Sequence, residues 1–251
     1  NFTDFNVFER LEGVSVRYVS SVQELGQPDM IFLPGSKNTM GDLHWMRQNG
    51  LEAAVKKLAA HIPVWGICGG YQMLGRTISD PHGVENENSL CEPLRGMELI
   101  DTDTTLMPEK MRTQTRGKFE NVTGIFSTLS GLEFSGYEIH MGKTTVSTGE
   151  HQTPLVQLAD GRTDGVQRME KGSEEPGVYG SYVHGIFDDG DIAVRIVQAL
   201  ADKKRVSWKP EAGGDYHAFK EQQYDKLAQG LREHLDMEYV YSILQESRIS
   251  S

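Results

Sequence analysis

The chain has 251 residues, 37% of them hydrophobic, and a formal net charge of −11 with neutral histidines; such a chain forms one large globular domain or two small ones. The acidic excess argues against binding to nucleic acid or to anionic membranes, because both require concentrated basic side chains. No apolar run approaches the roughly 20 residues that a membrane-spanning helix needs, so we expect a cytoplasmic protein with small-molecule or protein partners.

The first part of the chain alternates predicted strands and helices. Alternating or continuous apolar residues predict three strands, over 15–22, 29–33 and 62–67. Apolar residues at helical spacing predict three helices, over 40–48, over 51–61 and from 71 onward. This alternation is typical of a parallel sheet with crossover connections.

The centre and the end of the chain have other patterns. Threonine-rich and alternating segments between 97 and 166 predict antiparallel strands and hairpins. One more strand is predicted over 178–183, and helical spacing predicts helices over 192–200 and 219–235.

We therefore predict an α/β fold with an open, mostly parallel sheet flanked by helices, an antiparallel segment in the middle and a C-terminal helix. Residues 1–207 form the main domain in this interpretation, and 208–251 form a linker and a helical extension packed on the same domain.

A candidate nucleophile lies where a buried strand meets a helix. The segment Gly66-Ile67-Cys68-Gly69-Gly70 has the form Gly-x-nucleophile-x-Gly, with cysteine in the place of serine. The glycines allow a tight turn that pushes the side chain toward a substrate, and the start of a helix stabilises a thiolate. A buried structural cysteine in a glycine-rich turn is the alternative. The other cysteine, Cys91, lacks this glycine frame.

A thiolate nucleophile needs a proton carrier, and His184 is the first candidate. It ends an apolar strand and precedes a glycine, as Cys68 does. Side chains at the carboxyl ends of neighbouring parallel strands meet in one crevice, so we expect the two residues to meet there. His140 lies in the predicted antiparallel region and is the second candidate.

Four blocks of sequence, in this order, carry a family resemblance. They are Leu33-Pro34-Gly35-Ser36-Lys37-Asn38-Thr39, the block 66–75 around Cys68, Gly136-Tyr137-Glu138-Ile139-His140-Met141-Gly142 and Tyr182-Val183-His184-Gly185-Ile186-Phe187. Together they resemble the glutamine amidotransferase domain of the cobyric acid synthase family, over about residues 14–200.

The resemblance implies a class I glutaminase fold, glutamine as the nitrogen donor, and ammonia supplied to an ATP-dependent amidation of corrinoid carboxylates. Similar families are cobyrinic acid a,c-diamide synthase and the amidotransferases of cell-wall synthesis. The ending His140-Met141-Gly142 favours cobyric acid synthase among them.

Acyl-transfer chemistry assigns roles to further residues. Two oxyanions form along the reaction, and the backbone N–H of Gly69 and the turn at Gly35 and Ser36 are the expected donors. Gln72 resembles the family's glutamine-contacting position, with an ordinary polar residue as the alternative. Lys143 is a candidate for the substrate's α-carboxylate, although a solvated lysine is the favoured interpretation.

One position departs from the usual catalytic triad. Many class I amidotransferases have a glutamate two residues after the histidine, where this chain has Ile186. Asp188, Asp189, Glu138 or a backbone carbonyl remain open as the group that orients His184. Our hypothesis from the sequence is a Cys68–His184 dyad.

The sequence has no loop suited to ATP. The nearest match to a phosphate-binding loop, Gly142-Lys143-Thr144, lacks the first glycine at the required spacing because Tyr137 stands there. We expect no cofactor on this chain, with ATP and Mg²⁺ used by a synthetase domain elsewhere, and no metal site, because the histidines show no ligand spacing. A peptidase, a γ-glutamyl hydrolase and a non-enzymatic binding domain remain alternative functions.

Overall fold

The computed structural model describes residues 2–85, 92–147, 151–169, 177–189, 191–209 and 216–249. The chain divides into two compact units, residues 1–211 and residues 212–251, and each is described by itself. Cys91 and residues 210–215 of the predicted linker lie outside the described residues. None of the described helices is both long enough and apolar enough to cross a membrane.

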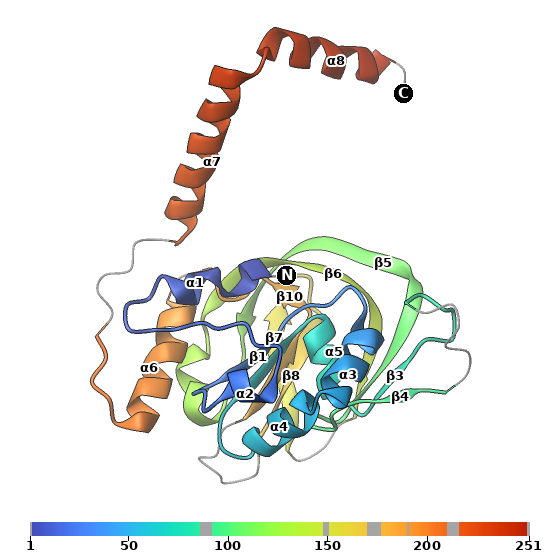
Figure 1. The fold of residues 1–251 in the computed structure, drawn as a ribbon, viewed down its shortest axis with the longest axis vertical. Coiled ribbons are helices and arrows are strands. Elements are labelled where there is room, and N and C mark those ends of the chain that lie inside the picture. The colour runs from blue at the N-terminus through green and yellow to red at the C-terminus, as the bar shows by residue number, and fades with distance from the viewer. Residues whose placement is uncertain are drawn as a thin grey trace. The chain divides into compact units, whose positions relative to one another are not determined.

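The larger unit is an α/β fold built on one mixed sheet (Figure 1). Its strands are β1 (Ile31–Leu33), β2 (Val64–Ile67), β3 (Thr77–Ser79), β4 (Leu94–Arg95), β5 (Thr102–Phe119), β6 (Glu133–Val146), β7 (Gln152–Leu158), β8 (Thr163–Arg168), β9 (Val178–Ser181) and β10 (Val183–His184). Its helices are η1 (Phe2–Phe5), α1 (Asn6–Glu9), α2 (Val22–Leu25), α3 (Thr39–Gln48), α4 (Leu51–Leu58), α5 (Gly69–Leu74), η2 (Gly124–Leu129) and α6 (Ile192–Lys204).

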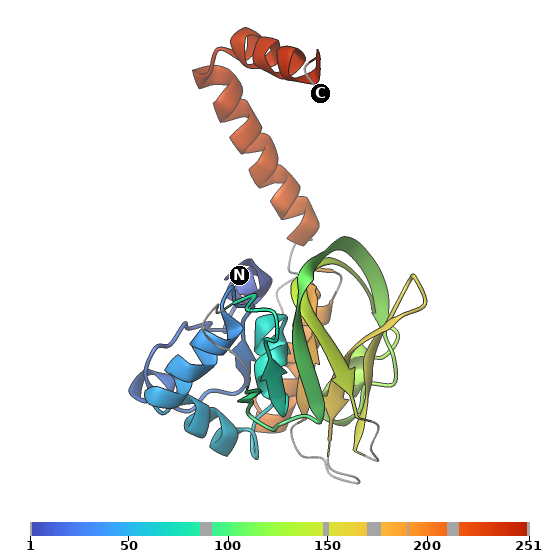
Figure 2. The same ribbon diagram turned by 90° about the vertical axis from the view of Figure 1, so that its right-hand side faces the viewer.

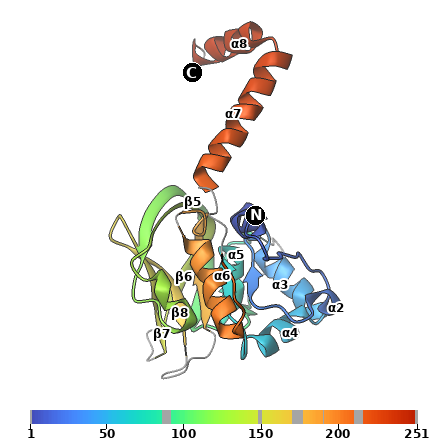
Figure 3. The same cartoon turned by 90° about the vertical axis from the view of Figure 1, so that its left-hand side faces the viewer.

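The strands that precede the two predicted catalytic residues are neighbours. β1, β2 and β9 pair in parallel, with Ile31 opposite Val64 and Trp65 opposite Tyr179. All four residues of β2 are buried, as the continuous apolar run predicted. Helices α3, α4 and α5 lie on one side of these strands (Figure 1). In the view of Figure 3, α6 lies in front of the sheet.

Aromatic side chains pack around β2 and anchor the strand that leads to Cys68. Trp65 is fully buried and stacks on Tyr179 with ring centroids 5.1 Å apart. Phe119 and Phe187 meet the Trp65 ring edge-on, at 6.2 and 5.1 Å. Aromatic pairs in these geometries add about 0.5–1.5 kcal/mol each beyond their buried area.

The antiparallel part of the sheet is dominated by one long pair of strands. β5 and β6 pair from Thr102–Val146 to Lys118–Glu133, with an irregularity between Leu106 and Met111. Figure 2 shows this two-stranded ribbon curling over the rest of the sheet. The ribbon is joined to the parallel strands through β10, which pairs with β6 at Val183 and His184.

The predicted fold class is confirmed, and the antiparallel part of the sheet is larger than the sequence indicated. Strands β1 and β2, helices α3 and α4, the β7–β8 hairpin and helix α6 all lie where the patterns predicted them. The predicted strand over 178–183 is interrupted at Tyr182, because the chain leaves β9 there and joins β6 as β10.

The strand predicted over 15–22 is wrong. Residues 14–19 pair with no strand among the described residues, and α2 begins at Val22. Val14, Val16 and Val19 instead pack partly against the core. This segment and β1 line an apolar cavity of about 880 Å³. The alternation of apolar and polar residues over 15–22 therefore arises because one side of the segment faces the core, although the segment pairs with no described strand.

The C-terminal unit contains two helices, α7 (Tyr216–His234) and α8 (Met237–Ile249). Helix α7 matches the helix predicted over 219–235, and α8 is additional. Asp236 separates them: its carboxylate accepts a hydrogen bond from the Tyr239 N–H at 3.0 Å, which caps the start of α8. The expected packing of residues 208–251 on the main domain stays a prediction.

Candidate active site

Cys68 occupies a strained turn between β2 and α5. Its backbone has φ 51° and ψ −108°, a conformation that residues with a Cβ rarely adopt. The flanking glycines make the turn possible: a Cβ on Gly70 would lie 2.0 Å from the carbonyl oxygen of Leu33, and one on Gly66 would lie 2.6 Å from the carbonyl carbon of Gly70. The sequence pattern therefore corresponds to an actual nucleophile elbow.

The thiol of Cys68 is buried and protonated. Only 6% of the residue is exposed, and its Sγ–H donates to the backbone carbonyl of Ile139 at 3.4 Å. Burial raises the pKa of this thiol to about 12 and outweighs the opposing effect of the Gly69 N–H. The N–H at the helix start acts in the expected direction, but burial has the larger effect on this pKa, which favours a mechanism in which a base takes the thiol proton.

His184 lies next to Cys68 across Gly35. A Cβ built on Gly35 would be 2.8 Å from Cε1 and 3.6 Å from Nε2 of His184, and 3.6 Å from Cβ of Cys68. The tip of the imidazole and the cysteine side chain therefore border the same small space, although 116 positions separate them in the sequence. Tyr137 stacks on the imidazole with centroids 5.1 Å apart.

The carboxylate that holds His184 comes from the start of the chain. Asp4 Oδ2 lies 2.8 Å from His184 Nδ1, and Asp4 Oδ1 accepts the Gly185 N–H at 2.9 Å. Because a carboxylate accepts, the proton lies on Nδ1, and Nε2 has the lone pair needed for a base. Asp4, His184 and Cys68 thus have the arrangement of a triad.

Asp4 is not among the groups that the sequence left open for orienting His184, which were Asp188, Asp189, Glu138 and a backbone carbonyl. Of these, Glu138 binds Arg162, and Asp189 accepts a hydrogen bond from the Ser135 N–H. The available signal was an acidic residue among the aromatic residues Phe2, Phe5 and Phe8. An acid in such an apolar stretch is expected to be buried with a partner.

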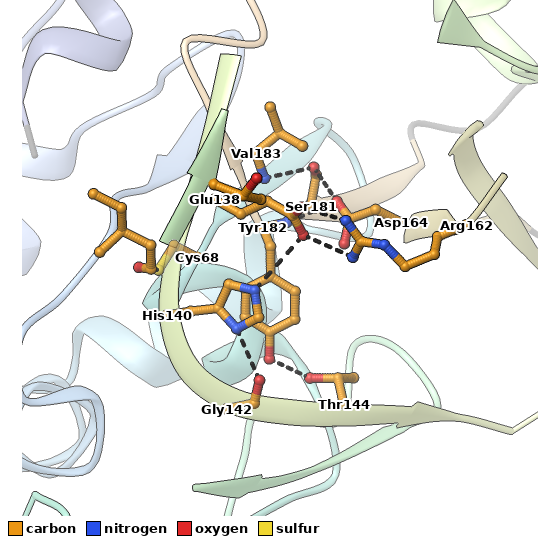
Figure 4. A network of polar contacts seen from close by, with 12 residues as sticks. Cys68, Glu138, His140, Gly142, Thr144, Arg162, Asp164, Ser181, Tyr182 and Val183 are labelled. Atoms are coloured by element: carbon orange, nitrogen blue, oxygen red, sulfur yellow. Dashed lines mark hydrogen bonds and ion pairs between the residues drawn. The ribbon is translucent and has the colours of Figure 1, made fainter. Parts of the chain in front are cut away.

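His140, the second candidate base, is engaged elsewhere. Its ring stacks on Tyr182 with centroids 3.7 Å apart, and its Nδ1–H donates to the Gly142 carbonyl at 2.8 Å. Its Nε2 lies 3.7 Å from Oε1 of Glu138. Figure 4 shows His140 directed toward Tyr182 and Glu138.

Gln72 is buried close to the nucleophile. It follows Cys68 by one turn of α5, is 3% exposed, and accepts a hydrogen bond from Thr39 Oγ1 at 3.1 Å. Its amide nitrogen donates to the hydroxyl of Tyr182 at 3.1 Å. These contacts fix the side chain in one orientation.

The side chain of Lys143 does not lie beside Gln72 and Cys68. It is exposed on β6, and its neighbour Gly142 faces Gln72, with 2.1 Å between a Cβ built on Gly142 and Nε2 of Gln72. Because successive side chains of a strand alternate between its faces, the side chain of Lys143 points away from Gln72.

The turn at Ser36 packs against the residue that follows Cys68. A Cβ on Gly69 would lie 2.7 Å from the backbone nitrogen of Ser36, so Gly69 and Ser36 are in close contact. The Ser36 hydroxyl donates to Asp42 and accepts the Asn38 N–H at 3.0 Å, which holds the turn. The turn predicted to supply oxyanion donors is therefore adjacent to Gly69.

A buried polar network supports the site from behind (Figure 4). Asp164 accepts hydrogen bonds from the Ser181 hydroxyl at 2.6 Å and the Tyr182 N–H at 2.9 Å, and burial raises its pKa. Glu138 accepts from Arg162 at 2.7 Å. Burial opposes its ionisation, but the contacts with His140 and Arg162 prevail and lower the pKa of Glu138 to about 2.

Within the described part of the chain, no cluster of three histidine, cysteine, aspartate or glutamate side chains is placed to hold a metal ion.

Comparisons with known proteins agree with this geometry. Residues 1–192 match the CobB/CobQ-like glutamine amidotransferase domain. The chain is 48% identical to cobyric acid synthase of Ruminiclostridium cellulolyticum, covering 98% of this chain and 47% of that protein. It is 41% identical to cobyric acid synthase of Lachnoclostridium phytofermentans, covering 98% of this chain and 48% of that protein. The chain spans about half the length of these curated relatives.

Solved structures show the same fold. A glutamine amidotransferase aligns with a TM-score of 0.53 at 15% identity, covering 82% of this chain and 95% of that one. PurLQS from Thermotoga maritima also aligns with a TM-score of 0.53 at 15% identity, covering 80% and 92%. The fold, the elbow at Cys68 and the sequence match agree, and the chain belongs to the CobB/CobQ-like glutamine amidotransferase domain family.

Proposed function

We propose that this chain is the glutaminase part of a cobyric acid synthase. It hydrolyses glutamine through a thioester on Cys68 and supplies ammonia for the ATP-dependent amidation of corrinoid carboxylates. The observation that carries the proposal is the arrangement of Cys68 and His184 on either side of Gly35, with Asp4 on the far nitrogen of the imidazole.

The first half of the reaction forms the thioester. Nε2 of His184 takes the thiol proton of Cys68, and the sulfur attacks the side-chain amide carbon of glutamine. The oxyanion receives hydrogen bonds from the backbone N–H of Gly69 and from the turn at Gly35 and Ser36; one such donor contributes about 3 kcal/mol to lowering the barrier.

The second half releases the products. The imidazolium of His184 gives its proton to the departing nitrogen, and ammonia leaves. Water, deprotonated by His184, then attacks the thioester through a second oxyanion and yields glutamate. Asp4 stabilises the imidazolium and keeps the ring in the productive orientation. This triad replaces the dyad inferred from the sequence.

Gln72 is proposed to contact the bound glutamine, supported by its fixed side chain near the nucleophile. The role of Lys143 at the α-carboxylate stays a prediction, with less support because its side chain points away from Gln72.

Carboxylate activation by ATP and Mg²⁺ is assigned to a synthetase domain, in the same polypeptide or on a separate chain. The support is the length of the curated relatives, about twice that of this chain. Cytoplasmic ATP and glutamine make the cytoplasm the proposed location. The related diamide synthase and cell-wall activities are not favoured, because the relatives described above are cobyric acid synthases.

The test measures ammonia release from glutamine and labelling by a glutamine-like electrophile, in the presence of the synthetase domain. We expect Cys68 to be labelled and Cys91 to stay unmodified, and we expect Cys68→Ser to lower turnover by at least about 10³-fold. Cleavage of γ-glutamyl peptides without ammonia release from glutamine would indicate a hydrolase instead. An unreactive Cys68 would indicate a binding domain.

A further inference from the structure

Strand β5 carries a row of basic side chains on one face. Arg112, Gln114 and Arg116 are exposed at alternate positions of β5, whereas Thr113 and Thr115 are partly buried. Lys110 is exposed just before them, in the irregular stretch between Leu106 and Met111. Side chains two residues apart in a strand point to the same face. This row is about 20 Å long at ~3.4 Å per residue and stands out in a chain of net charge −11.

The basic side chains of this row form no ion pairs among the described residues. Many basic side chains elsewhere have acidic partners, for example Arg47 with Glu52 and Arg162 with Glu138. Lys118, farther along β5, pairs with Glu120 at 3.0 Å. No ion pair of Lys110, Arg112 or Arg116 occurs in the part of the chain that the structure describes. Glu133 and Asp189 line the same hollow as Arg116, so the positive charge is partly offset at that end of the row.

The same face of the ribbon continues on β6 with Tyr137 and Ile139. Arg112 lies opposite Ile139 and Gln114 lies opposite Tyr137 in the β5–β6 register. Directly opposed residues of an antiparallel pair have their side chains on one face. We call the surface formed by Lys110, Arg112, Arg116, Tyr137 and Ile139 the basic ribbon face.

This face adjoins both reacting side chains. The Ile139 carbonyl accepts the thiol hydrogen bond of Cys68 at 3.4 Å, and the Tyr137 ring stacks on His184. A partner that binds the basic ribbon face thus contacts the strand against which the nucleophile and the base are held.

The opposite face of the ribbon is tied to Gln72. His140 stacks on Tyr182, the hydroxyl of Tyr182 bonds to Thr144 and to Gln72, and Glu138 binds Arg162 (Figure 4). A displacement of β6 would therefore change the contacts of Gln72 as well as those of Cys68.

We propose that the basic ribbon face is the docking surface for an acidic patch of the ATP-dependent synthetase domain, and that docking there couples glutamine hydrolysis to amidation. The proposal rests on the proposed function, which requires such a domain. Charge complementarity selects an acidic partner, and two residue types of this face, arginine and tyrosine, are enriched in protein interfaces.

A protein partner fits this face better than a nucleic acid. The row has three cations, and the net charge of −11 would repel an extended polyanion. A stable interface buries about 800 Å² on each partner, so the basic ribbon face would be the charged part of a larger contact. Its position beside Cys68 also puts the partner close to the released ammonia.

The test uses a full-length chimera, in which this chain replaces the matching region of the Ruminiclostridium cellulolyticum relative. Amidation of a corrinoid is measured with glutamine and, separately, with ammonium as the nitrogen source. The test variant is Arg112→Glu with Arg116→Glu. The control is Lys57→Glu with Lys209→Glu, which reverses two exposed charges outside the basic ribbon face.

We expect the test variant to lower glutamine-dependent amidation by about 10-fold or more, since each 1.4 kcal/mol is a factor of ten. Ammonium-dependent amidation should stay within about 2-fold, because the synthetase chemistry is untouched. Added salt should weaken glutamine-dependent amidation more in the parent chimera than in the test variant. The control should resemble the parent in all three measurements.

Three results would overturn the proposal. The first is glutamine-dependent amidation in the test variant equal to that in the control. The second is an equal loss with both nitrogen sources and a raised KM for the corrinoid, which would make the face a substrate-binding surface. The third is recovery of nucleic acid with the parent chimera and its loss in the test variant.

Failure of the proposed function itself gives a different result. In that case the parent chimera uses ammonium but not glutamine, and Cys68 is not labelled by the glutamine-like electrophile. Thermal unfolding of each variant separates loss of docking from loss of the fold.

Discussion

The two sides of the active site are held by different kinds of interaction. Cys68 depends on backbone geometry, since glycines on both sides permit a turn with φ 51° packed closely against Leu33 and Ser36. His184 depends on side-chain contacts with segments far away in sequence, Asp4 at the start of the chain and Tyr137 on β6. A local motif therefore points to Cys68 as the candidate nucleophile, whereas the contacts of the candidate base, His184, exist only in the folded protein.

The largest expected effect tests the contact between Asp4 and His184. Asp4→Asn removes the acceptor that fixes the imidazole, and we expect glutaminase kcat to fall by about 10²- to 10⁴-fold because the wrong tautomer is favoured. The control is Asp189→Asn, which alters a carboxylate bonded to the Ser135 N–H and should change kcat by less than about 10-fold.

Steady-state kinetics with glutamine, in the presence of the synthetase domain, measures both variants. A drop confined to KM in Asp4→Asn would contradict a role of Asp4 on the base. A loss in Asp189→Asn as large as that in His184→Ala would place the orienting group near His184 in sequence.

The next effect tests the glycine-dependent turn at Cys68. Gly70→Ala forces a Cβ to within 2.0 Å of the Leu33 carbonyl oxygen, and we expect the free energy of unfolding to fall by about 3 kcal/mol or more. Gly230→Ala is the control, since a Cβ there meets nothing within 4 Å and a helical alanine is favoured over glycine. Denaturant unfolding of Gly70→Ala at parental stability would show that the elbow tolerates a side chain.

A pH series probes the buried thiol itself. Because the pKa of Cys68 is raised to about 12, the thiolate fraction should grow about tenfold per pH unit between pH 7 and 9. Labelling by iodoacetamide should follow this rise in a Cys91→Ser background, in which Cys68 is the only cysteine. Free cysteine is the control, and it levels off above about pH 8.5. A plateau for Cys68 below pH 8 would mean that the thiolate is stabilised.

The smallest effect concerns the network behind the site. Glu138→Gln removes a charged acceptor of Arg162, and we expect a loss of about 1–2 kcal/mol in the free energy of unfolding at neutral pH. The folded-state pKa of Glu138 is lowered to about 2, so its contribution is present above pH 4.5 and declines as the pH falls toward 2. The parent and the variant should therefore converge in acid, and a difference that persists at pH 2 would contradict this.

Much of the fold was predictable because its signals are local. The buried run that became β2, the apolar spacing of α4 and the glycines around Cys68 each act within a few residues. The strand predicted over 15–22 was wrong because the alternation of apolar and polar residues there reflects one side buried against the core. Nothing in that pattern indicates whether a neighbouring strand exists to pair with the segment.

The partners of His184 could not be predicted in the same way. Asp4 and His184 are 180 positions apart, and their hydrogen bond exists only because η1 packs beside the end of β10. The stacking of His140 on Tyr182 likewise joins segments that are 42 positions apart and is not encoded in a short pattern.

The amino-acid sequence by itself determined the tight turn at Cys68 and the family of the protein, because steric limits on the backbone and motif order are properties of short segments. Only the tertiary structure decided which carboxylate holds the imidazole, that the thiol is kept neutral by burial, and that β6 covers it. These depend on desolvation and on contacts between remote segments, and neither exists until the chain is folded.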